Sequence, residues 1–517
     1  MSEQVAEARF AELTIALSLA TDLGTGQPLE HGLRTCWLSA KAAEALGLDE
    51  PTRSHVYHVA LLRFLGCTSD ASDAAVFAGG DDVAFNATFA PMLNAQPGES
   101  VRFLIGHLAA DLPLRRRIRR VARALGDPGG TLRSLSAHCE AGSRLATRIG
   151  MPPAVCDSLA HAYERWDGKG YPHGVAGDDV PTAIRIVTVA RDAELWARQA
   201  GWATVADVLA RRRGRAYDPA VVDALLGDGE AWLAGIGDDP CAAVLDAEPA
   251  PVLTLDDSRI DEALTAVADF ADLKSPFFLG HSTGVAVLAG KAATAAGLSD
   301  EDAAMLRRAG LVHDIGKVGV ASGIWDHPGP LSADQWERVR LHTYLGERVL
   351  SRCRLLEPYT AIAARHHERV DGSGYHRGLA GDQLGVGARI LAAADVYHAL
   401  IEPRPHRPAL TPAAAATRLL DEVDGRRLGR AEVDAVLAVA GQASRPPHID
   451  RPAGLTEREV DVLRLIARGQ ANKQVAATLG IAPKTVGRHI EHIYAKAGVT
   501  TRAGATLFAM EHGLLEL

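Results

Sequence analysis

Side chains that can bind metal ions are concentrated in the second half of this 517-residue chain. The set comprises His281, His313, Asp314, His342, His366, His367 and Asp395. Imidazole and carboxylate ligands together suit iron, manganese and similar ions. Seven such groups exceed the three or four that one ion takes from a protein, so the set predicts two divalent ions that share a bridging carboxylate. The alternative, histidines scattered for structural reasons, fits this ordered succession less well.

Lys317 adds a positive charge to the same region. It follows His313 by four residues, one turn of a helix, so the two side chains are expected on the same face. A cation beside two metal ions can hold a phosphate oxygen. We therefore expect phosphoryl chemistry in which Asp314 and Lys317 take part directly.

The segments that must position these residues are predicted to be helices. Apolar residues recur at intervals of three and four in VAVLAGKAATAAGL, in AAMLRRAGLVHDIG and in the last part of the chain. Alternating patterns typical of strands are nearly absent. The chain is therefore predicted to be all-α, and its length requires more than one hydrophobic core.

Composition excludes several classes of protein. A formal net charge of -9 argues against a chain that coats nucleic acid along its whole length. The six cysteines lie far apart, which argues against a disulfide framework or a zinc finger. No apolar run approaches the roughly 18 residues that a membrane span needs. The N-terminus has no signal pattern, so we expect a cytoplasmic protein without a membrane partner.

The ordered ligands belong to a recognisable set of motifs. His281, HDIGK from His313, His342, HHE from His366, DGSGY from Asp371 and AAADVYHAL resemble the HD-GYP family of HD-domain phosphohydrolases, over roughly Arg259 to Ala440. The resemblance implies an all-α fold, two or three iron or manganese ions, and hydrolysis of cyclic di-GMP. It also implies that His281, His313, Asp314 and Asp395 hold one metal. Asp314 would bridge to a second, held by His342, His366 and His367. By the same resemblance Lys317, Arg404 and Arg407 contact phosphate, and Tyr375 faces the nucleotide.

Two positions depart from the family. The proline of GYP is replaced by His376, which affects loop geometry and nucleotide selectivity and makes His376 either an extra polar contact or an exposed side chain. Some members have a glutamate four residues before the first histidine for a third metal, where this chain has Phe277. We therefore expect two metals rather than three.

The first half of the chain repeats the second. The block that begins at His31 aligns with the block that begins at His281, at an offset of 250 residues. A later block that begins at Tyr163 aligns with the one that begins at His367, at an offset of 204 residues. The extra residues in the first copy are expected between Asp70 and Pro128. His31 and His138 correspond to His281 and His342. The remaining ligands are replaced by Arg63, Phe64, Ala162, Tyr163 and Arg191, while Cys67 takes the place of Lys317. The first copy is thus predicted to be catalytically inactive, and to serve in packing, in dimerisation or as a ligand sensor.

The C-terminal segment has the pattern of a helix-turn-helix domain. Thr456 and Glu459 form a predicted capping box, Gly469 ends that helix, Asn472 caps the next, and Pro483 begins a third. NKQVAATLGIAPKTVGRHIEHIYAKAGV resembles the LuxR-type DNA-binding domain, a four-helix member of this class. The resemblance places a recognition helix from about Pro483 to Lys496. The expected DNA contacts are Lys473, Lys484, Thr485, Arg488 and His489. Such domains bind paired half-sites, so a homodimer on double-stranded DNA is expected.

Three domains are predicted: 1–245, a degenerate HD-GYP-like copy; 255–443, the metal-dependent phosphohydrolase; and 452–517, the DNA-binding domain. Linkers are expected at Gly237 to Asp257 and at Ser444 to Gly454, where Pro, Gly and Asp are frequent. The leading hypothesis is a transcription regulator that hydrolyses cyclic di-GMP or a related cyclic dinucleotide. The alternatives are a non-catalytic sensor that binds nucleotide and metal and controls DNA binding, and a hydrolase of another nucleotide or phosphate ester.

Overall fold

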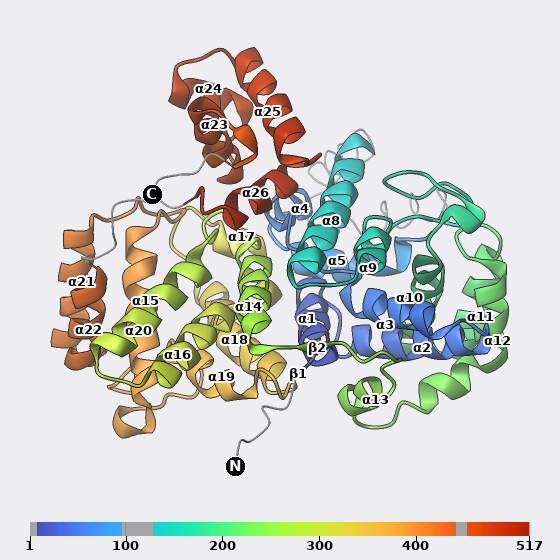
Figure 1. Ribbon diagram of the computed structural model, residues 1–517, viewed down its shortest axis with the longest axis horizontal. Helices are drawn as coiled ribbons and strands as arrows, with labels where there is room; N and C mark the ends of the chain where they lie inside the picture. Colours follow the sequence, from blue (N-terminus) through green and yellow to red (C-terminus); the bar gives the residue numbers. More distant parts are fainter. Residues whose placement is uncertain (1–7, 96–98, 100–127, 441–451, 516–517) are drawn as a thin grey trace. The chain divides into compact units, whose positions relative to one another are not determined.

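A computed structural model gives the fold of the chain, and it describes residues 8–95, 99, 128–440 and 452–515. The chain divides into two compact units, Met1–Ile260 and Asp261–Leu517, called here the first and second units. Helices account for nearly all regular structure, so the all-α prediction is confirmed (Figure 1). The described residues include two short strands, β1 (Ala8–Arg9) and β2 (Thr254–Leu255), paired antiparallel. Within the described ranges no helix has both the length and the apolar character needed to cross a membrane.

The first unit is a helical bundle whose core includes α2, α3 and α10. Its helices are α1 (Phe10–Gly24), α2 (His31–Ala45), α3 (Glu50–Leu62), α4 (Ala71–Ala78), α5 (Asp82–Phe89), η1 (Ala90–Met92), α8 (Pro128–Arg148), α9 (Pro153–Leu159), η2 (Gly177–Asp179), α10 (Thr182–Ala200), α11 (Trp202–Arg212), α12 (Pro219–Ala234) and α13 (Pro240–Asp246). The extra residues predicted between Asp70 and Pro128 contribute α4, α5 and η1, and the rest of that segment lies mostly outside the described residues.

The second unit begins with a bundle in which α15 packs against α16, α20 and α22, while α18 packs against η3 and α19 (Figure 1). Its helices are α14 (Asp257–Asp272), α15 (His281–Ala295), α16 (Asp300–Val312), η3 (Ile315–Gly319), α17 (Ser322–Trp325), α18 (Ala333–Leu350), α19 (Glu357–Ala363), η4 (Gly381–Gln383), α20 (Val386–Ile401), α21 (Pro412–Asp424) and α22 (Arg430–Ala440). Small and branched apolar side chains of α15, α20 and α22, such as Val285, Leu391 and Val436, form its core.

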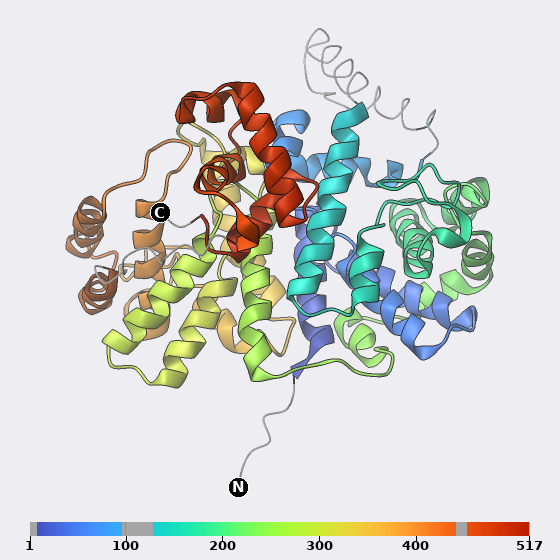
Figure 2. The ribbon, with the colours of Figure 1, turned by 45° about the horizontal axis from the view of Figure 1, so that its top comes forward.

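The chain ends in a short 3-10 turn and four helices, drawn in red in Figure 2. They are η5 (Pro452–Gly454), α23 (Glu457–Ala467), α24 (Asn472–Leu479), α25 (Pro483–Ala497) and α26 (Arg502–Glu511). They have their own core, which includes Leu463, Val486 and Phe508. The predicted capping box at Thr456 and Glu459 is confirmed. The predicted cap at Asn472 is wrong by one residue, because Ala471 is the N-cap and the Gln474 side chain accepts its backbone N–H.

Local sequence signals explain where the helices that carry the metal-binding residues begin. Ser299 caps α16 by accepting the N–H of Asp302 at 3.1 Å, and three acidic residues in the first turn favour that end of the helix dipole. Ser332 and Gln335 form a capping box at the start of α18. These caps fix the register of both helices and hence the direction of the side chains they carry.

The linker expected at Gly237 to Asp257 is wrong in part. Asp239 accepts the N–H of Ala242 at 3.1 Å and Pro240 stands at the first position of α13, so this Pro- and Asp-rich stretch begins a helix instead of continuing as coil. Strand β2 follows within the same stretch. The second expected linker, Ser444 to Gly454, lies outside the described residues except for η5.

In both units a glycine lets two backbone segments approach closely, and the two glycines occupy corresponding positions. In the second unit a Cβ on Gly316 would collide with the carbonyl oxygen of His342, so only glycine allows η3 to lie this close to α18. In the first unit a Cβ on Gly66 would collide in the same way with the carbonyl oxygen of His138. The two glycines are paired by the offset of 250 and the two histidines by the offset of 204.

A buried glutamate anchors the glycine-rich loop in each unit. Glu368 accepts the backbone N–H groups of Arg377 at 2.8 Å and Leu379 at 2.9 Å. Glu164 accepts those of His173 at 2.6 Å and Gly174 at 3.1 Å. The glutamate that follows His367 in the second unit, and the one that follows Tyr163 in the first, therefore anchor the loop in the same way.

Candidate metal centre

The seven predicted ligands come from five places in the second unit. His281 is the first residue of α15, and His313 with Asp314 fills the junction between α16 and η3. His342 lies within α18, and Asp395 lies within α20. His366 and His367 occupy the turn that follows α19. All are buried except His367, which is half-buried.

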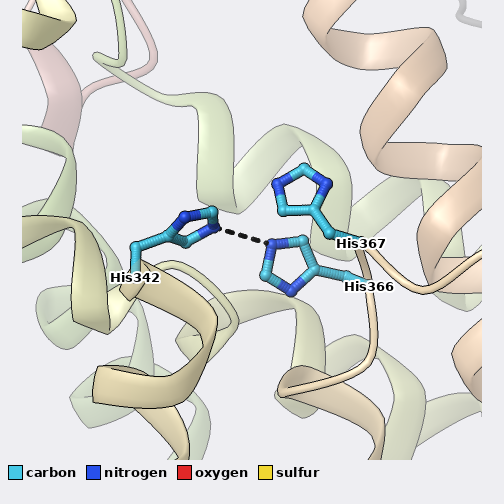
Figure 3. A group of neighbouring side chains, drawn as sticks. All are labelled: His342, His366 and His367. Carbon is cyan, nitrogen blue, oxygen red and sulfur yellow. Dashed lines mark hydrogen bonds between the residues drawn. The ribbon is translucent and has the colours of Figure 1, made fainter. Parts of the chain in front are cut away.

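The structure brings these side chains together in overlapping groups. Ligand atoms of His281, His313 and Asp395 lie within 4.8 Å of one another, as do those of His342, His366 and His367. Figure 3 shows the second group, in which His342 and His366 point their Nε2 atoms at each other, 3.3 Å apart. A third group, His313, Asp314 and His366, overlaps the other two.

Asp314 lies between the two histidine groups. Its Oδ2 is 3.1 Å from His313 Nε2 and 3.6 Å from His281 Nε2. Its Oδ1 is 3.6 Å from His342 Nε2 and 3.5 Å from His366 Nε2. Each carboxylate oxygen thus faces a different group of imidazoles, which is the geometry that a bridging ligand requires.

Three of the imidazoles are oriented by the backbone of their own segment. In each, Nδ1 bonds the carbonyl oxygen three residues earlier at 2.6 Å. The pairs are His313 with Gly310, His342 with Val339 and His366 with Ala363. A carbonyl can only accept, so Nδ1 carries the proton and the Nε2 lone pair faces the cluster, as a metal ligand needs.

His281 is oriented differently, by a side chain. As the first residue of its helix it uses the carbonyl of Phe278 for its own backbone N–H, at 2.8 Å. Its Nδ1 instead bonds Glu402 Oε2 at 2.8 Å, which leaves Nε2 facing Asp395 Oδ1 at 3.1 Å. Glu402 also lies 3.2 Å from His398 Nδ1 and accepts from Arg404 at 2.8 Å.

Asp272 fixes the start of the helix that carries His281. Its carboxylate accepts the backbone N–H of Ser282 at 2.9 Å and the Ser282 hydroxyl at 2.7 Å. Burial raises the pKa of Asp272 to about 7 although the neighbouring His281 lowers it. Sequence reasoning missed both Asp272 and Glu402. Glu402 directly follows α20, seven residues after Asp395, and this spacing alone does not identify it as the partner of His281.

The electrostatics of the site favour ionised carboxylates and neutral imidazoles. Burial would raise the pKa values of Asp314 and Asp395, but the surrounding histidines, and Lys317 for Asp314, bring both well below the ordinary value. Burial lowers the pKa of His342 to about 3 and lowers those of His366 and His367. These are the protonation states in which the groups bind metal ions.

His281 is the exception among the imidazoles. Burial would lower its pKa, but the carboxylates of Glu402 and Asp395 raise it to about 9. At neutral pH this side chain must therefore release a proton from Nε2 before that atom can act as a ligand.

Several ligand atoms of this cluster lack a hydrogen-bond partner among the residues described, which is what atoms that bind a metal ion would show. Within the described part of the chain, His313 Nε2 and both carboxylate oxygens of Asp314 are buried without a hydrogen-bond partner. Asp314 is met only by ion pairs with Lys317 and the imidazoles. Buried polar atoms without partners cost about 1–3 kcal/mol each, more when charged, and cations at this position would remove that cost.

Lys317 does not lie one α-helical turn from His313 as expected. Helix α16 ends at Val312 and the 3-10 helix η3 follows, in which side chains three residues apart are aligned. Lys317 Nζ therefore pairs with Asp314 Oδ2. Its ammonium also lies 4.2 Å from the centre of the Phe278 ring, so a positive charge is held beside the carboxylate in a mostly apolar setting.

The residues expected around the substrate lie in different settings. The Tyr375 ring is centred 4.8 Å from that of His367. Arg404 reaches the edge of the cluster, 3.5 Å from His281 Nδ1, and also binds the carbonyl of Phe277. Arg407 donates to the carbonyls of Ala399, Leu400 and Glu402, so its guanidinium caps the end of α20 instead of being free for phosphate. His376 makes polar contacts, 2.8 Å from Glu347 Oε2 and 3.1 Å from the Thr343 hydroxyl.

The expected DNA contacts lie on the C-terminal helices. Lys484, Thr485 and Arg488 are exposed on α25, His489 beside them is half-buried, and Lys473 is exposed at the start of α24. Val486 and Ile493 of the same helix are buried in the core, so α25 has one apolar and one basic face. Among the described residues, Lys484 and Arg488 form no ion pair with a carboxylate, which leaves both charges available to a phosphate backbone.

Comparison with known proteins relates both parts of the chain to known families. The HD domain family matches residues 131–221 and 265–431, and the luxR family of bacterial regulatory proteins matches residues 453–509. The 3'3'-cGAMP-specific phosphodiesterase 3 of Vibrio cholerae is 30% identical over 418 residues, which cover 80% of this chain and 90% of that protein. The cyclic di-GMP phosphodiesterase response regulator RpfG of Xanthomonas campestris is 36% identical over 31% of this chain and 46% of its own length.

A solved structure extends the likeness to three dimensions. The crystal structure of the cyclic GMP-AMP specific phosphodiesterase V-cGAP3 of V. cholerae superposes with a TM-score of 0.59 at 26% identity, and the match covers 85% of this chain and 99% of that one. The metal-dependent phosphodiesterase and the DNA-binding module expected from the sequence are both borne out at this level. The chain belongs to the HD-domain family of metal-dependent phosphodiesterases, and it carries a C-terminal domain of the LuxR family.

Proposed function

We propose that the chain is a transcription regulator whose second unit hydrolyses a cyclic dinucleotide, cyclic di-GMP or a close relative. The placement of Asp314 supports this most strongly, because its two oxygens face two separate groups of imidazoles. The relatives named for 3'3'-cGAMP and cyclic di-GMP support the substrate class.

In this proposal two divalent ions, iron or manganese, occupy the centre. One is held by His281, His313, Asp314 and Asp395, and the other by Asp314, His342, His366 and His367. When bound, the ions lower the pKa of a water molecule towards neutrality and offset negative charge on the phosphoryl oxygens. Phe277 supplies no carboxylate for a third ion.

The protein's own side chains orient and polarise the substrate. Lys317 keeps Asp314 ionised and places a positive charge where the phosphoryl group gains negative charge. Arg404 adds a second cation beside His281. The Tyr375 ring, close to His367, offers a flat surface to a base of the dinucleotide. Water adds across one P–O bond, the released sugar oxygen takes a proton, and the product is the linear dinucleotide.

The C-terminal domain is proposed to bind double-stranded DNA through α25. Lys484 and Arg488 are exposed on this helix and Lys473 is exposed on α24, which supports phosphate contacts by these cations. Thr485 and His489 of the same helix are proposed to contact base edges. We expect a homodimer on paired half-sites, with domains at 1–245, 255–443 and 452–517. Light scattering of the purified chain with and without DNA tests the dimer.

The catalytic assignment is tested with purified full-length protein by metal analysis and by chromatography of the products from cyclic di-GMP, 3'3'-cGAMP and cyclic di-AMP. The wild type should bind two ions per chain and linearise at least one of these substrates. The variant with His313→Ala and Asp314→Ala should lose both metal and turnover. The matched control is Glu337→Gln, an exposed residue of α18. Full activity in the double variant, or metal binding without turnover of any cyclic dinucleotide by the wild type, would reject the proposal.

A further inference from the structure

Two arginines of the first unit stand where the metal centre of the second unit has ligands. Arg63 directly follows α3 as His313 directly follows α16, and Arg191 lies within α10 as Asp395 lies within α20. The matching close approach of Gly66 to α8 and of Gly316 to α18 shows that the surrounding backbone is arranged alike. Arg63 is 5% exposed and Arg191 2% exposed, so both charges are buried.

The two guanidinium groups are neighbours. The central carbon of each lies 5.7 Å from the centre of the same Phe64 ring. Arg63 donates to the Thr188 hydroxyl at 2.7 Å, one turn before Arg191 on α10. Arg191 donates to the carbonyl of Ala90 at 2.7 Å and to Asp192 at 2.6 Å. Phe64, at the position of Asp314, thus lies against both cations and offers no carboxylate to either of them.

Too few acidic groups neutralise these cations. Asp192 is buried, and beside Arg191 it also binds Arg212 at 3.3 Å, Asn94 at 3.0 Å and the Tyr217 hydroxyl. Arg63 touches no carboxylate among the described residues, and Nε of both Arg63 and Arg191 is buried without a partner. A buried charge without a counter-ion is costly, so the arrangement favours an anion. Burial and Arg191 lower the pKa of Arg63 to about 10, at which it is still charged at neutral pH.

The two histidines of the first unit that correspond to metal ligands each pair with a carboxylate, and Nε2 of His31 stays buried without a partner among the described residues. His138 bonds Asp70 Oδ1 and the Tyr163 hydroxyl, and His31 pairs with Glu194. Within the described residues of the first unit no group of three ligand side chains gathers closely enough for a metal ion. The position therefore has positive charge without the means to bind a metal or to activate water.

We propose that the first unit binds a phosphate group at Arg63 and Arg191 without any metal, and does not hydrolyse it. Guanidinium groups match phosphate oxygens in shape and charge, and two of them replace the positive charge that metal ions bring to the other site. The phosphate belongs either to a nucleotide diester or to free inorganic phosphate. This inference is independent of catalysis in the second unit.

The test uses the full chain with Asp314→Ala, so that no substrate is consumed, dialysed against EDTA. Binding of labelled 3'3'-cGAMP and, separately, of labelled phosphate is measured by equilibrium dialysis. We expect one site per chain that weakens with added salt, and at least a tenfold loss of affinity with Arg63→Met. Arg213→Met, an exposed arginine of the same unit paired with Asp223, is the matched control and should change nothing.

The two probes separate the sources of the phosphate. Dinucleotide binding that inorganic phosphate displaces indicates a nucleotide ligand, whereas binding of inorganic phosphate alone indicates the free ion. Thr188→Val, which removes only the hydroxyl bonded to Arg63, should lower affinity by a few fold and serves if Arg63→Met does not fold. No metal-free binding of either probe, or binding that survives Arg63→Met but is lost with Arg404→Met, would overturn the inference. Either result leaves metal-dependent hydrolysis by the wild type unaffected.

Discussion

Replacing Glu402 with alanine should weaken metal binding while leaving the second unit folded. Glu402 is the carboxylate that holds Nδ1 of His281, whereas His313, His342 and His366 use carbonyls of their own segments. Without it the His281 ring loses its fixed orientation. Arg404, whose Nη2 lies 3.5 Å from His281 Nδ1, would then face the imidazole without an intervening negative charge.

The expected loss of metal affinity can be estimated from the usual contribution of a residue that hydrogen-bonds to a metal ligand. Loss of such a hydrogen-bond partner costs about 10–100-fold in metal affinity, or about 1.4–2.7 kcal/mol. Glu402→Ala should fall in the upper part of this range, because it also leaves Arg404 unneutralised. Glu402→Gln keeps an oxygen that can accept from Nδ1, so its loss should be about tenfold or less.

Manganese titration of the metal-free chain in competition with a chelating dye measures the affinity directly. Turnover of bis(p-nitrophenyl) phosphate over a range of manganese concentrations provides the second readout. If Glu402 acts by orienting His281, activity should return at high manganese. Glu337→Ala is the control on the exposed face of α18. Manganese affinity within twofold of the wild type in Glu402→Ala would refute the reasoning.

Three further predictions concern separate features. Gly316→Ala should place a methyl group against the carbonyl of His342 and destabilise the second unit by about 1–3 kcal/mol or more, measured by urea unfolding, whereas Gly385→Ala, with open space around it, should not. Burial would raise the pKa of Glu459, but Lys496 and Thr456 lower it to about 2, so its stabilising contribution is present above its ordinary pKa of 4.5 and is lost as pH falls towards 2. After correction for the intrinsic slowing of amide exchange in acid, the hydrogen-exchange protection of 452–515 should therefore fall between pH 4.5 and 2 by an amount that corresponds to at most about 3 kcal/mol, and Glu459→Gln should remove most of that fall. In a plot of log affinity for duplex DNA against log salt concentration, Arg488→Ala should reduce the slope by about one. Arg430→Ala, at a surface arginine of α22, is the control. Equal slopes for the two variants would contradict a phosphate contact by Arg488.

The ligand cluster could be predicted because its information is local. Histidine and aspartate at fixed positions on periodic helices determine which side chains can converge, and the structure brings all seven together. Helix starts were predictable for the same reason, since caps such as Thr456 depend on residues three apart. The error at α13 arose because Asp239 and Pro240 are typical both of a linker and of a helix start.

What the sequence could not give depends on contacts between distant segments. Glu402 is recognisable as a partner of His281 only when α20 lies against α15, since 121 residues separate them. The arginine motif after Asp395 suggested two phosphate ligands, but the turn of the chain after Ile401 folds Arg407 back onto its own helix. Lys317 was misplaced because α16 ends one residue before His313, and no sequence signal marked the change to a 3-10 helix.

The i−3 carbonyl bonds of His313, His342 and His366 have a consequence for how this scaffold tolerates substitution. Each of these ligands is oriented by a carbonyl of its own segment, so one of them can be substituted without changing the orientation of the others. Metal affinity can then be tuned, or lost, in single steps while the bundle stays intact. His281 does not share this independence, because its orientation depends on a second residue, and the two must change together. Three of the five histidines of the centre can therefore change independently, whereas His281 is coupled to Glu402.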